Sequence, residues 1–227
     1  MFVKIKNLLH NLILPTETLD ESKSKWSSLA KENSNYYIYS ACGRDISDSE
    51  FVNSGVSDYK DLVVNDRFLQ KFLGPKKDKV ALEIGCGTGR VTQAMAKDFK
   101  HVYGTDISAE MILQAKDKNK KNNITFLETD GSSFPLPDNS VDFVFSFIVF
   151  QHMPSKKVVR DNFSEIYRLL KSGGVAKIQV RGIPTEKGKW YYGVSFDKKS
   201  IQKVVLDLKI LKTSGEGEKY FWLWLQK

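Results

Sequence analysis

Three glycines, Gly85, Gly87 and Gly89, stand at alternate positions directly after the apolar run Val80–Ile84. Glycine tolerates left-handed backbone and leaves bare main chain for a ligand to approach, so this pattern predicts a cofactor-binding turn at the end of a buried strand. A dinucleotide-binding loop would carry its third glycine three residues after the second, where this chain has Arg90. The spacing therefore weakens a pyrophosphate-binding interpretation. A tight strand-to-helix turn without a ligand is the structural alternative.

Two acidic residues flank this turn. Asp106 follows the next apolar segment, about 20 residues beyond the loop, where an acid can accept hydrogen bonds from both hydroxyls of a ribose. The same acid would serve NAD, and it could instead only cap the helix that begins near Ser108. Glu83 lies inside the apolar run, where an unpaired carboxylate is costly to bury. We therefore expect both acids to have specific partners.

His152 is the candidate general base. It is one of three histidines and follows the fourth predicted strand, and its imidazole titrates near neutral pH. A role in shaping the pocket or capping a helix is the alternative interpretation. A reaction at an amine that loses its proton to water would need no general base.

Predicted strands and helices alternate from Val80 onward, which indicates a parallel sheet covered by helices on both faces. The chain should end in an antiparallel hairpin, because its last two strands are joined by a short turn. The stretch from Tyr59 to Leu73 has apolar residues at helical spacing and predicts one helix, ended by Gly74-Pro75. The predicted strands are Val80–Ile84, Val102–Thr105, Ile124–Leu127, Val141–Phe147, Val175–Val180, Lys209–Thr213 and residues 219–226.

The segment "LEIGCGTGR" resembles motif I of the class I S-adenosylmethionine-dependent methyltransferases, in a small-molecule, methyltransferase type 11-like form. Three further segments extend the resemblance toward the C-terminus: "VYGTDIS", "FLETDGSSFPLPDNSVDFVFSF" and "IYRLLKSGGVAKIQV". Ser172 stands where proline is common in the family. The resemblance implies a Rossmann-like, doubly wound α/β fold. Its seven-stranded sheet would be mostly parallel, with an antiparallel C-terminal hairpin strand.

The resemblance also implies S-adenosylmethionine as the cofactor, with no metal. The glycine loop would lie against the methionine portion, Asp106 would hold the ribose, and Asp130-Gly131 would meet the adenine. Glu83 would orient the loop or reach the methionine ammonium through water. The residues expected to bind the cofactor are Glu83, Gly85, Cys86, Gly87, Gly89, Asp106, Ile107, Met111, Asp130, Gly131 and Phe147.

Aromatic residues in two regions are expected to bound the pocket of a small hydroxyl or amine acceptor, although they could equally pack helices onto the sheet. A loop after the fifth strand carries one group, and the N-terminal segment carries the other. Arg181 or Lys189 could hold a phosphate or carboxylate. The expected acceptor-binding residues are Trp26, Tyr36, Tyr37, Tyr39, Arg181, Trp190 and Tyr191.

The chain of 227 residues is expected to contain two parts, an N-terminal helical lid segment (1–57) and a methyltransferase domain (58–227). A short amphipathic helix is expected over residues 1–14. Residues 26–57 are polar with a few aromatic side chains, so they have little core of their own and are predicted to form a mobile lid that a ligand orders.

The overall composition of the chain limits the binding partners and the cellular location that we expect. The net charge of +8 comes from 35 basic against 27 acidic residues, and lysine-rich stretches such as residues 116–123 lack interleaved aromatic residues, which argues for a solvated surface and against nucleic-acid binding. The longest apolar run, residues 143–150, is too short to span a membrane. Two cysteines, one of them inside the glycine loop, favour reduced thiols and a cytoplasmic location. A monomer or homodimer is expected.

Three other functions compete with small-molecule methyl transfer. An RNA-directed methyltransferase is disfavoured because the fourth strand exits as "SFIV" and lacks an Asn/Asp-Pro-Pro-Tyr type of motif. An NAD-dependent oxidoreductase is disfavoured by Arg90. The last alternative is a non-catalytic, cofactor-binding partner protein.

Overall fold

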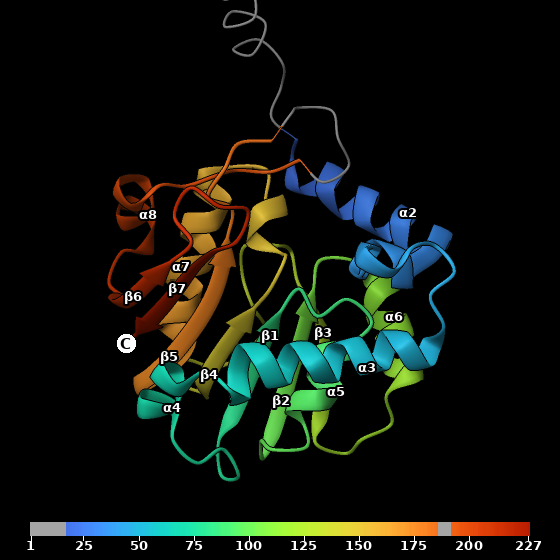
Figure 1. Ribbon diagram of the computed structural model, residues 1–227, viewed down its shortest axis with the longest axis horizontal. Coiled ribbons are helices and arrows are strands. Elements are labelled where there is room, and N and C mark those ends of the chain that lie inside the picture. Colours follow the sequence, from blue (N-terminus) through green and yellow to red (C-terminus); the bar gives the residue numbers. More distant parts are fainter. Residues whose placement is uncertain (1–16, 186–191) are drawn as a thin grey trace, which may run out of the picture.

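The computed structural model describes residues 17–185 and 192–227 (Figure 1). The helix expected over residues 1–14 lies outside the described residues. Within the part of the chain that the structure describes, no helix combines the length and the apolar character needed to cross a membrane.

A single seven-stranded sheet forms the centre of the fold, with strand order β3-β2-β1-β4-β5-β7-β6. Strands β1 to β5 run parallel, and β7 pairs antiparallel with both β5 and β6. This arrangement confirms the predicted fold class, including the antiparallel hairpin at the C-terminus. The strands are β1 (Val80–Ile84), β2 (His101–Asp106), β3 (Ile124–Glu128), β4 (Val141–Ser146), β5 (Leu170–Val180), β6 (Lys209–Ser214) and β7 (Phe221–Gln226).

Helices cover both faces of this sheet (Figure 1). Since successive strand residues point to opposite faces, Val144 packs into one apolar core while its neighbours Phe143 and Phe145 pack into the other. The helices are α2 (Leu19–Ile38), α3 (Asp48–Tyr59), α4 (Arg67–Leu73), α5 (Arg90–Met95), α6 (Ala109–Lys118), α7 (Lys156–Leu169) and α8 (Lys198–Val205). The short helical turns are η1 (Ser40–Cys42), η2 (Lys60–Val64) and η3 (Phe150–His152).

The single helix predicted from Tyr59 to Leu73 is wrong, because the structure breaks it at Asn65–Asp66. The chain leaves α3 through the π-helical turn η2 and begins α4 with Asp66 as N-cap, whose carboxylate accepts from the Leu69 N–H at 2.9 Å. The other oxygen of Asp66 forms an ion pair with buried Lys177 on β5, 2.7 Å away. A tertiary contact therefore fixes this break, and apolar periodicity does not reveal it.

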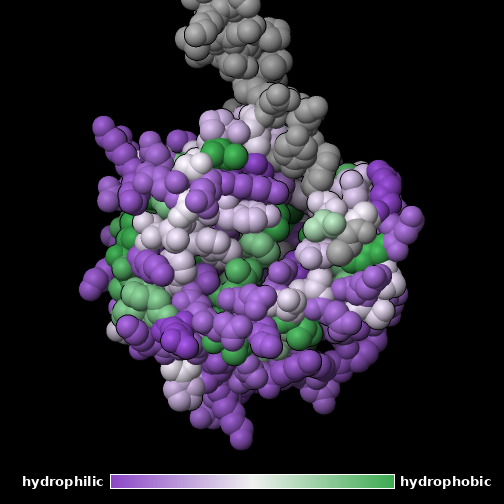
Figure 2. All heavy atoms as spheres, viewed as in Figure 1, coloured by the Kyte–Doolittle hydropathy of each residue, from purple (hydrophilic) through white to green (hydrophobic). Residues whose placement is uncertain are grey.

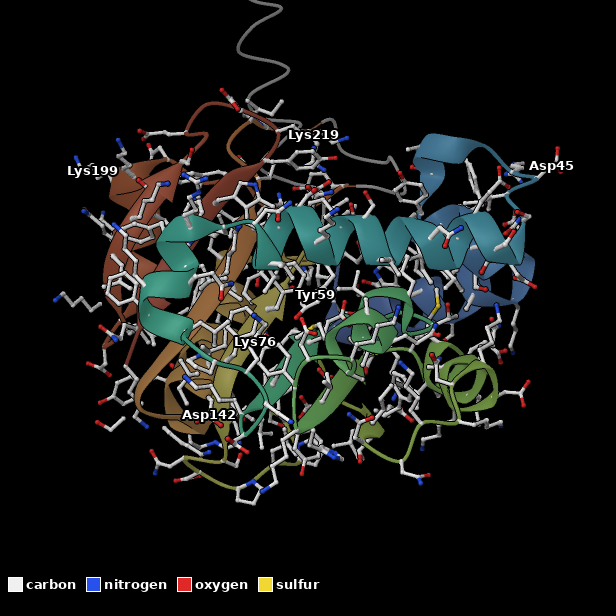
Figure 3. The ribbon with its side chains drawn as sticks, turned by 60° about the horizontal axis from the view of Figure 1, so that its bottom comes forward. Asp45, Tyr59, Lys76, Asp142, Lys199 and Lys219 are labelled. Atoms are coloured by element: carbon white, nitrogen blue, oxygen red, sulfur yellow. The ribbon has the colours of Figure 1, made fainter. Side chains whose placement is uncertain are left out.

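Two long helices, α2 and α3, make up the described part of the N-terminal segment. Helix α3 crosses the molecule with Tyr59 near its end (Figure 3), where the Tyr59 hydroxyl donates to Asp98 at 2.7 Å. It packs closely on α5, because a Cβ added to Gly55 would lie 2.2 Å from the carbonyl oxygen of Arg90. Helix α2 contacts α6 and contains non-helical backbone at Asn33. Hydrophilic residues cover most of the face shown in Figure 2, with smaller apolar groups between them.

Candidate functional site

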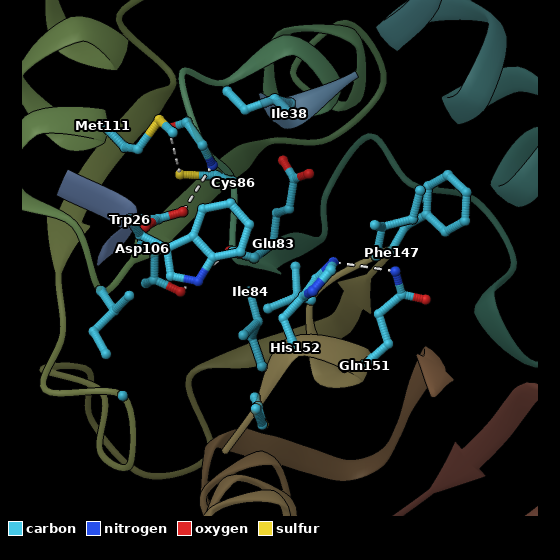
Figure 4. A pocket seen from close by; sticks show the side chains of 18 of the residues that line it. Trp26, Ile38, Glu83, Ile84, Cys86, Asp106, Met111, Phe147, Gln151 and His152 are labelled. Carbon is cyan, nitrogen blue, oxygen red and sulfur yellow. Dashed lines mark hydrogen bonds between the residues drawn. The ribbon is translucent and has the colours of Figure 1, made fainter. Parts of the chain in front are cut away.

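A cavity of about 610 Å³ opens where β1, β2 and β4 end, beneath α2. This is the edge of a doubly wound sheet at which ligands bind, and the volume suits a small-molecule cofactor together with a second ligand. Figure 4 shows Trp26, Glu83, Asp106 and His152 around this space. The cavity joins the predicted glycine loop, the acid after β2, the start of α2 and the segment after β4.

The glycine loop has the left-handed backbone that its sequence predicts. Gly85, Gly87 and Gly89 have φ angles of 72°, 54° and 86°. The N–H groups of Gly85 and Cys86 both donate to the carbonyl oxygen of Thr105, at 2.7 and 2.9 Å, which ties the loop to β2. Gly85, Cys86 and Gly87 line the cavity, whereas Gly89 begins α5 as its N-cap.

Close neighbours above the loop explain why side chains are absent there. A Cβ on Gly85 would lie 2.2 Å from Val149 Cγ2, and a Cβ on Gly87 would lie 2.6 Å from Ile38 Cδ1. We expect Gly85→Ala to lower the free energy of unfolding by about 2–4 kcal/mol, since it combines left-handed strain with overpacking. Gly173→Ala is the control, because Gly173 has φ +77° but nothing near its added Cβ. Urea unfolding that gave both variants equal losses would show that crowding contributes nothing.

Asp106 lies at the end of β2 and faces the cavity. One carboxylate oxygen accepts from the Gly87 N–H at 3.0 Å, and the other accepts from the Ser108 N–H at 2.9 Å. Burial raises the pKa of Asp106, and the hydrogen bonds from the backbone of Ser108 and Gly87 oppose that rise. Its side chain therefore connects the glycine loop to the start of α6, and each oxygen keeps capacity for a further donor.

Glu83 is buried in β1 with 5% of its surface exposed, and it also lines the cavity. The Thr92 hydroxyl on α5 donates to its carboxylate. Burial raises the pKa of Glu83 to about 8, against the lowering effects of the Thr92 hydrogen bond and the charge of Arg90. A cation bound in the cavity would favour the ionised form of this acid.

Arg90 has a role that the sequence analysis missed. Its buried guanidinium forms an ion pair with Asp58 on α3 at 2.6 Å and donates to the Ser54 hydroxyl at 3.2 Å. It also lies 4.9 Å from the centre of the Tyr39 ring. Arg90 thus fixes α3 and the end of α2 to the glycine loop. Only its place directly after Gly89 could have drawn attention to it.

Beside Asp106, the cavity has the apolar wall expected for an adenine ring. Ile107, Met111 and Gly131 line it, together with Leu19, Thr129 and Phe134. Asp130 is exposed and does not line the cavity; its carboxylate accepts from the Ser132 and Ser133 N–H groups at 2.8 and 2.7 Å. Its role toward adenine stays a prediction.

The cavity also has a set of aromatic and basic side chains, which includes residues expected around an acceptor. Phe147 stacks on Trp222 at 5.4 Å between ring centres and meets the Tyr220 ring at 5.6 Å. Trp26, Tyr37, Tyr39 and Arg181 also line the cavity, as do Lys219 and Tyr220, which the sequence analysis missed. Tyr36 does not line it and packs against Arg44. Trp190 and Tyr191 lie outside the described residues.

His152 belongs to the turn η3 and is 6% exposed. The edge of its ring meets Trp26 of α2 at 5.4 Å between ring centres. Its Nε2 lies 3.1 Å from Gln151 Nε2, and Gln151 Oε1 accepts from Gln179 Nε2 at 3.1 Å. The candidate base is therefore part of a buried chain of amides that begins on β5.

Sequence comparisons relate this chain to known methyltransferases. Residues 82–178 match the methyltransferase domain family. Phosphoethanolamine N-methyltransferase 2 of Caenorhabditis elegans is 33% identical over 138 residues, which are 59% of this chain and 29% of that protein. A malonyl-[acyl-carrier protein] O-methyltransferase of Hamiltonella defensa is 34% identical over 112 residues, 49% of this chain and 41% of that protein. The chain thus spans less than half the length of either relative.

A solved structure reproduces the fold over most of the chain. Phosphoethanolamine N-methyltransferase 1 of Haemonchus contortus, in complex with phosphoethanolamine and S-adenosylhomocysteine, superposes with a TM-score of 0.65 at 15% identity. The superposition covers 92% of this chain and 50% of that one. The match over residues 82–178 identifies a methyltransferase domain in this chain, and its sheet order and glycine loop are those expected of the class I S-adenosylmethionine-dependent methyltransferases.

Proposed function

We propose that this protein transfers the methyl group of S-adenosylmethionine to a hydroxyl or amine of a small molecule. The observation that carries the proposal is the cavity itself. Its lining combines bare glycine backbone, the Asp106 carboxylate and an apolar wall with aromatic and basic side chains. Its volume of about 610 Å³ leaves room for an acceptor beside a cofactor. The two relatives are named for different acceptors, phosphoethanolamine and malonyl-[acyl-carrier protein], so their names do not select one for this chain.

The residues present fit the cofactor of the family. Gly85 and Gly87 keep the backbone bare where the methionine portion would lie, and Asp106 has acceptor capacity for two ribose hydroxyls. Ile107 and Met111 offer an apolar surface for the adenine. Glu83 would attract the methionine ammonium. When bound, the cofactor supplies a methyl group on a positively charged sulfur.

The chain's own part in the reaction would be alignment and exclusion of water. Phe147, whose ring stacks on Trp222, would form the part of the cavity wall against which the methyl donor and the acceptor lie. Trp26 and Tyr39 would cover the acceptor from the N-terminal segment. His152 would contact the acceptor, either as a general base or as a hydrogen-bonding group.

Cofactor choice separates this proposal from an NAD-dependent oxidoreductase. S-adenosylhomocysteine at 100 times its dissociation constant should stabilise the protein by about 2.7 kcal/mol, whereas NADH should leave the melting temperature unchanged. Differential scanning calorimetry measures both. A rise with NADH and none with S-adenosylhomocysteine would overturn the proposal.

Residues 26–57 of the N-terminal segment are proposed to act as a lid over the cavity. Trp26 and Tyr39 line the cavity, and Ile38 lies above Gly87, so a ligand would contact the segment directly. We expect S-adenosylhomocysteine to slow hydrogen exchange in residues 26–57 more than in α8, none of whose residues lines the cavity. Equal protection with and without the ligand would instead mean permanent packing.

We further propose that the protein is cytoplasmic. We also propose that it is a monomer or a homodimer and does not bind nucleic acid. Cys86 is a buried free thiol in the loop, which suits a reducing compartment. Size-exclusion chromatography with light scattering tests the oligomeric state.

A further inference from the structure

The orientation of the Gln179 side chain is determined by the backbone around it. Its Oε1 accepts from the Ile148 N–H at 2.9 Å, and its Nε2 donates to the carbonyl oxygen of Val180 at 2.6 Å. A backbone N–H can only donate and a carbonyl can only accept, so the amide cannot be reversed. Gln179 is fully buried, so these groups are not exposed to bulk solvent.

Ile148 supports this arrangement at a conformational cost. It has a φ of 59°, a left-handed conformation that β-branched residues rarely adopt. Strained backbone of this kind gathers at functional sites, where the surroundings hold it in place. Here the strained residue lines the cavity and directs its N–H at Gln179.

The orientation of the Gln179 amide fixes the orientation of the Gln151 amide, which in turn determines the tautomer of the His152 imidazole. Gln179 Nε2 donates to Gln151 Oε1 at 3.1 Å, so the NH₂ group of Gln151 faces His152 Nε2, also at 3.1 Å (Figure 4). An NH₂ group can only donate, and His152 Nε2 must therefore accept. A neutral imidazole that accepts at Nε2 carries its proton on Nδ1.

This tautomer leaves His152 without a lone pair for a substrate proton. The lone pair of Nε2 is engaged by Gln151, and Nδ1 already bears hydrogen. Protonation of Nε2 would place two donors against each other at 3.1 Å. Arg181 and Lys219 line the same cavity and disfavour further positive charge, while Glu83 and Asp106 lie around the glycine loop.

The carboxylates in the cavity are also engaged. Among the described lining residues they are Asp58, Glu83 and Asp106. Asp58 is paired with Arg90 at 2.6 Å, and Glu83 accepts from the Thr92 hydroxyl. Asp106 accepts from two backbone N–H groups, and its remaining acceptor capacity is the one proposed for the ribose hydroxyls. Each of these three carboxylates therefore already accepts a hydrogen bond or forms an ion pair within the described part of the chain.

We infer that Gln179 and Gln151 are positioning residues that hold His152 in the neutral tautomer with its proton on Nδ1, so that it is not a general base, and that the acceptor is an amine or a carboxylate. The inference rests on the proposed function and changes its acceptor: it excludes a neutral hydroxyl and adds a carboxylate, which also needs no base. A lone pair of the acceptor forms the new bond to the methyl carbon. The methyl–sulfur bond breaks with its electrons staying on sulfur, and any amine proton leaves to water. No step requires His152 to take up a proton.

Imidazole ¹⁵N spectra of the full chain with S-adenosylhomocysteine test the tautomer directly. We expect a protonated Nδ1 and an unprotonated Nε2 for His152 at about pH 7. A His152→Asn spectrum assigns the signals, and His101, whose Nε2 lies 3.0 Å from the Thr125 hydroxyl, is the internal reference. A proton on Nε2, or a doubly protonated ring, would overturn the inference.

A substitution in the relay gives a second readout. Gln151→Glu replaces the donor with a carboxylate that can only accept, so the proton should move to Nε2 and the ¹⁵N pattern should invert. Gln226→Glu at the far end of β7 is the matched control and should leave the pattern unchanged. An unchanged pattern in a folded Gln151→Glu variant would contradict the relay. If that variant does not fold, the spectrum of the unsubstituted chain still decides the tautomer.

The acceptor is tested separately by tritium transfer from labelled S-adenosylmethionine. Label in an amine or a methyl ester supports the inference, and the two products distinguish the two acceptors. Label in an ether would overturn the acceptor assignment while leaving the proposed function intact. Absence of any transfer would instead count against the proposed function, whatever the ¹⁵N spectra show.

Discussion

Asp106→Ala is expected to raise the dissociation constant for S-adenosylhomocysteine by about 10²–10⁴-fold. Two charge-assisted bonds to ribose hydroxyls, each worth roughly 1.5–3 kcal/mol, would be lost. The substitution also frees the Gly87 N–H, which Asp106 holds at 3.0 Å, so the loop would lose part of its ordering. Isothermal titration calorimetry measures the affinity, and the melting temperature without ligand reports whether the fold is kept.

Asp117→Ala is the matched control for this substitution. Asp117 lies on α6, near Asp106 in sequence, but its side chain is 86% exposed. The control should bind S-adenosylhomocysteine as the unsubstituted chain does. Unchanged affinity in a folded Asp106→Ala variant would show that this carboxylate does not hold the cofactor.

Glu83→Gln is expected to raise stability at alkaline pH by roughly 2–5 kcal/mol in the absence of cofactor. Burial raises the pKa of Glu83 from 4.5 to about 8 in the folded chain. The folded state therefore binds this proton more tightly than the unfolded state does. The stabilisation is present below about pH 4.5 and is lost as the pH rises to about 8. Glutamine is neutral throughout and avoids this loss.

Urea unfolding at several pH values between about 5 and 9 measures the difference between the two chains. The difference should grow with pH and level off above about pH 8. Glu218→Gln, at an exposed position in the turn between β6 and β7, should show no such trend. A difference that stayed constant with pH would mean that Glu83 does not titrate in this range.

Local spacing was enough to predict the geometry of the glycine loop and of the acid and helix cap beside it. The glycine loop, Asp106 and the cap at Ser108 are close to one another in sequence, and backbone geometry brings them together at the ends of β1 and β2. Alternating strands and helices fixed the order of the elements for the same reason. The antiparallel hairpin followed from its short turn alone.

Contacts between distant segments could not be predicted. Arg90 and Asp58 pair across two helices, and Gln179 reaches Gln151 from a different element. The separation of the two partners along the sequence does not reveal either pairing. Asp66 breaks a helix because Lys177, far along the chain, holds it. Asp130 failed to reach the cavity because its own turn supplies nearer donors, Ser132 and Ser133.

Methyl transfer itself is the most direct test of this account. Tritiated S-adenosylmethionine is incubated with the protein and a nuclease-treated cell extract, and the labelled product is isolated. We expect label in the small-molecule fraction, retained after nuclease treatment and lost with Asp106→Ala. Label confined to RNA, or no transfer by a chain that binds S-adenosylhomocysteine, would contradict small-molecule methyl transfer.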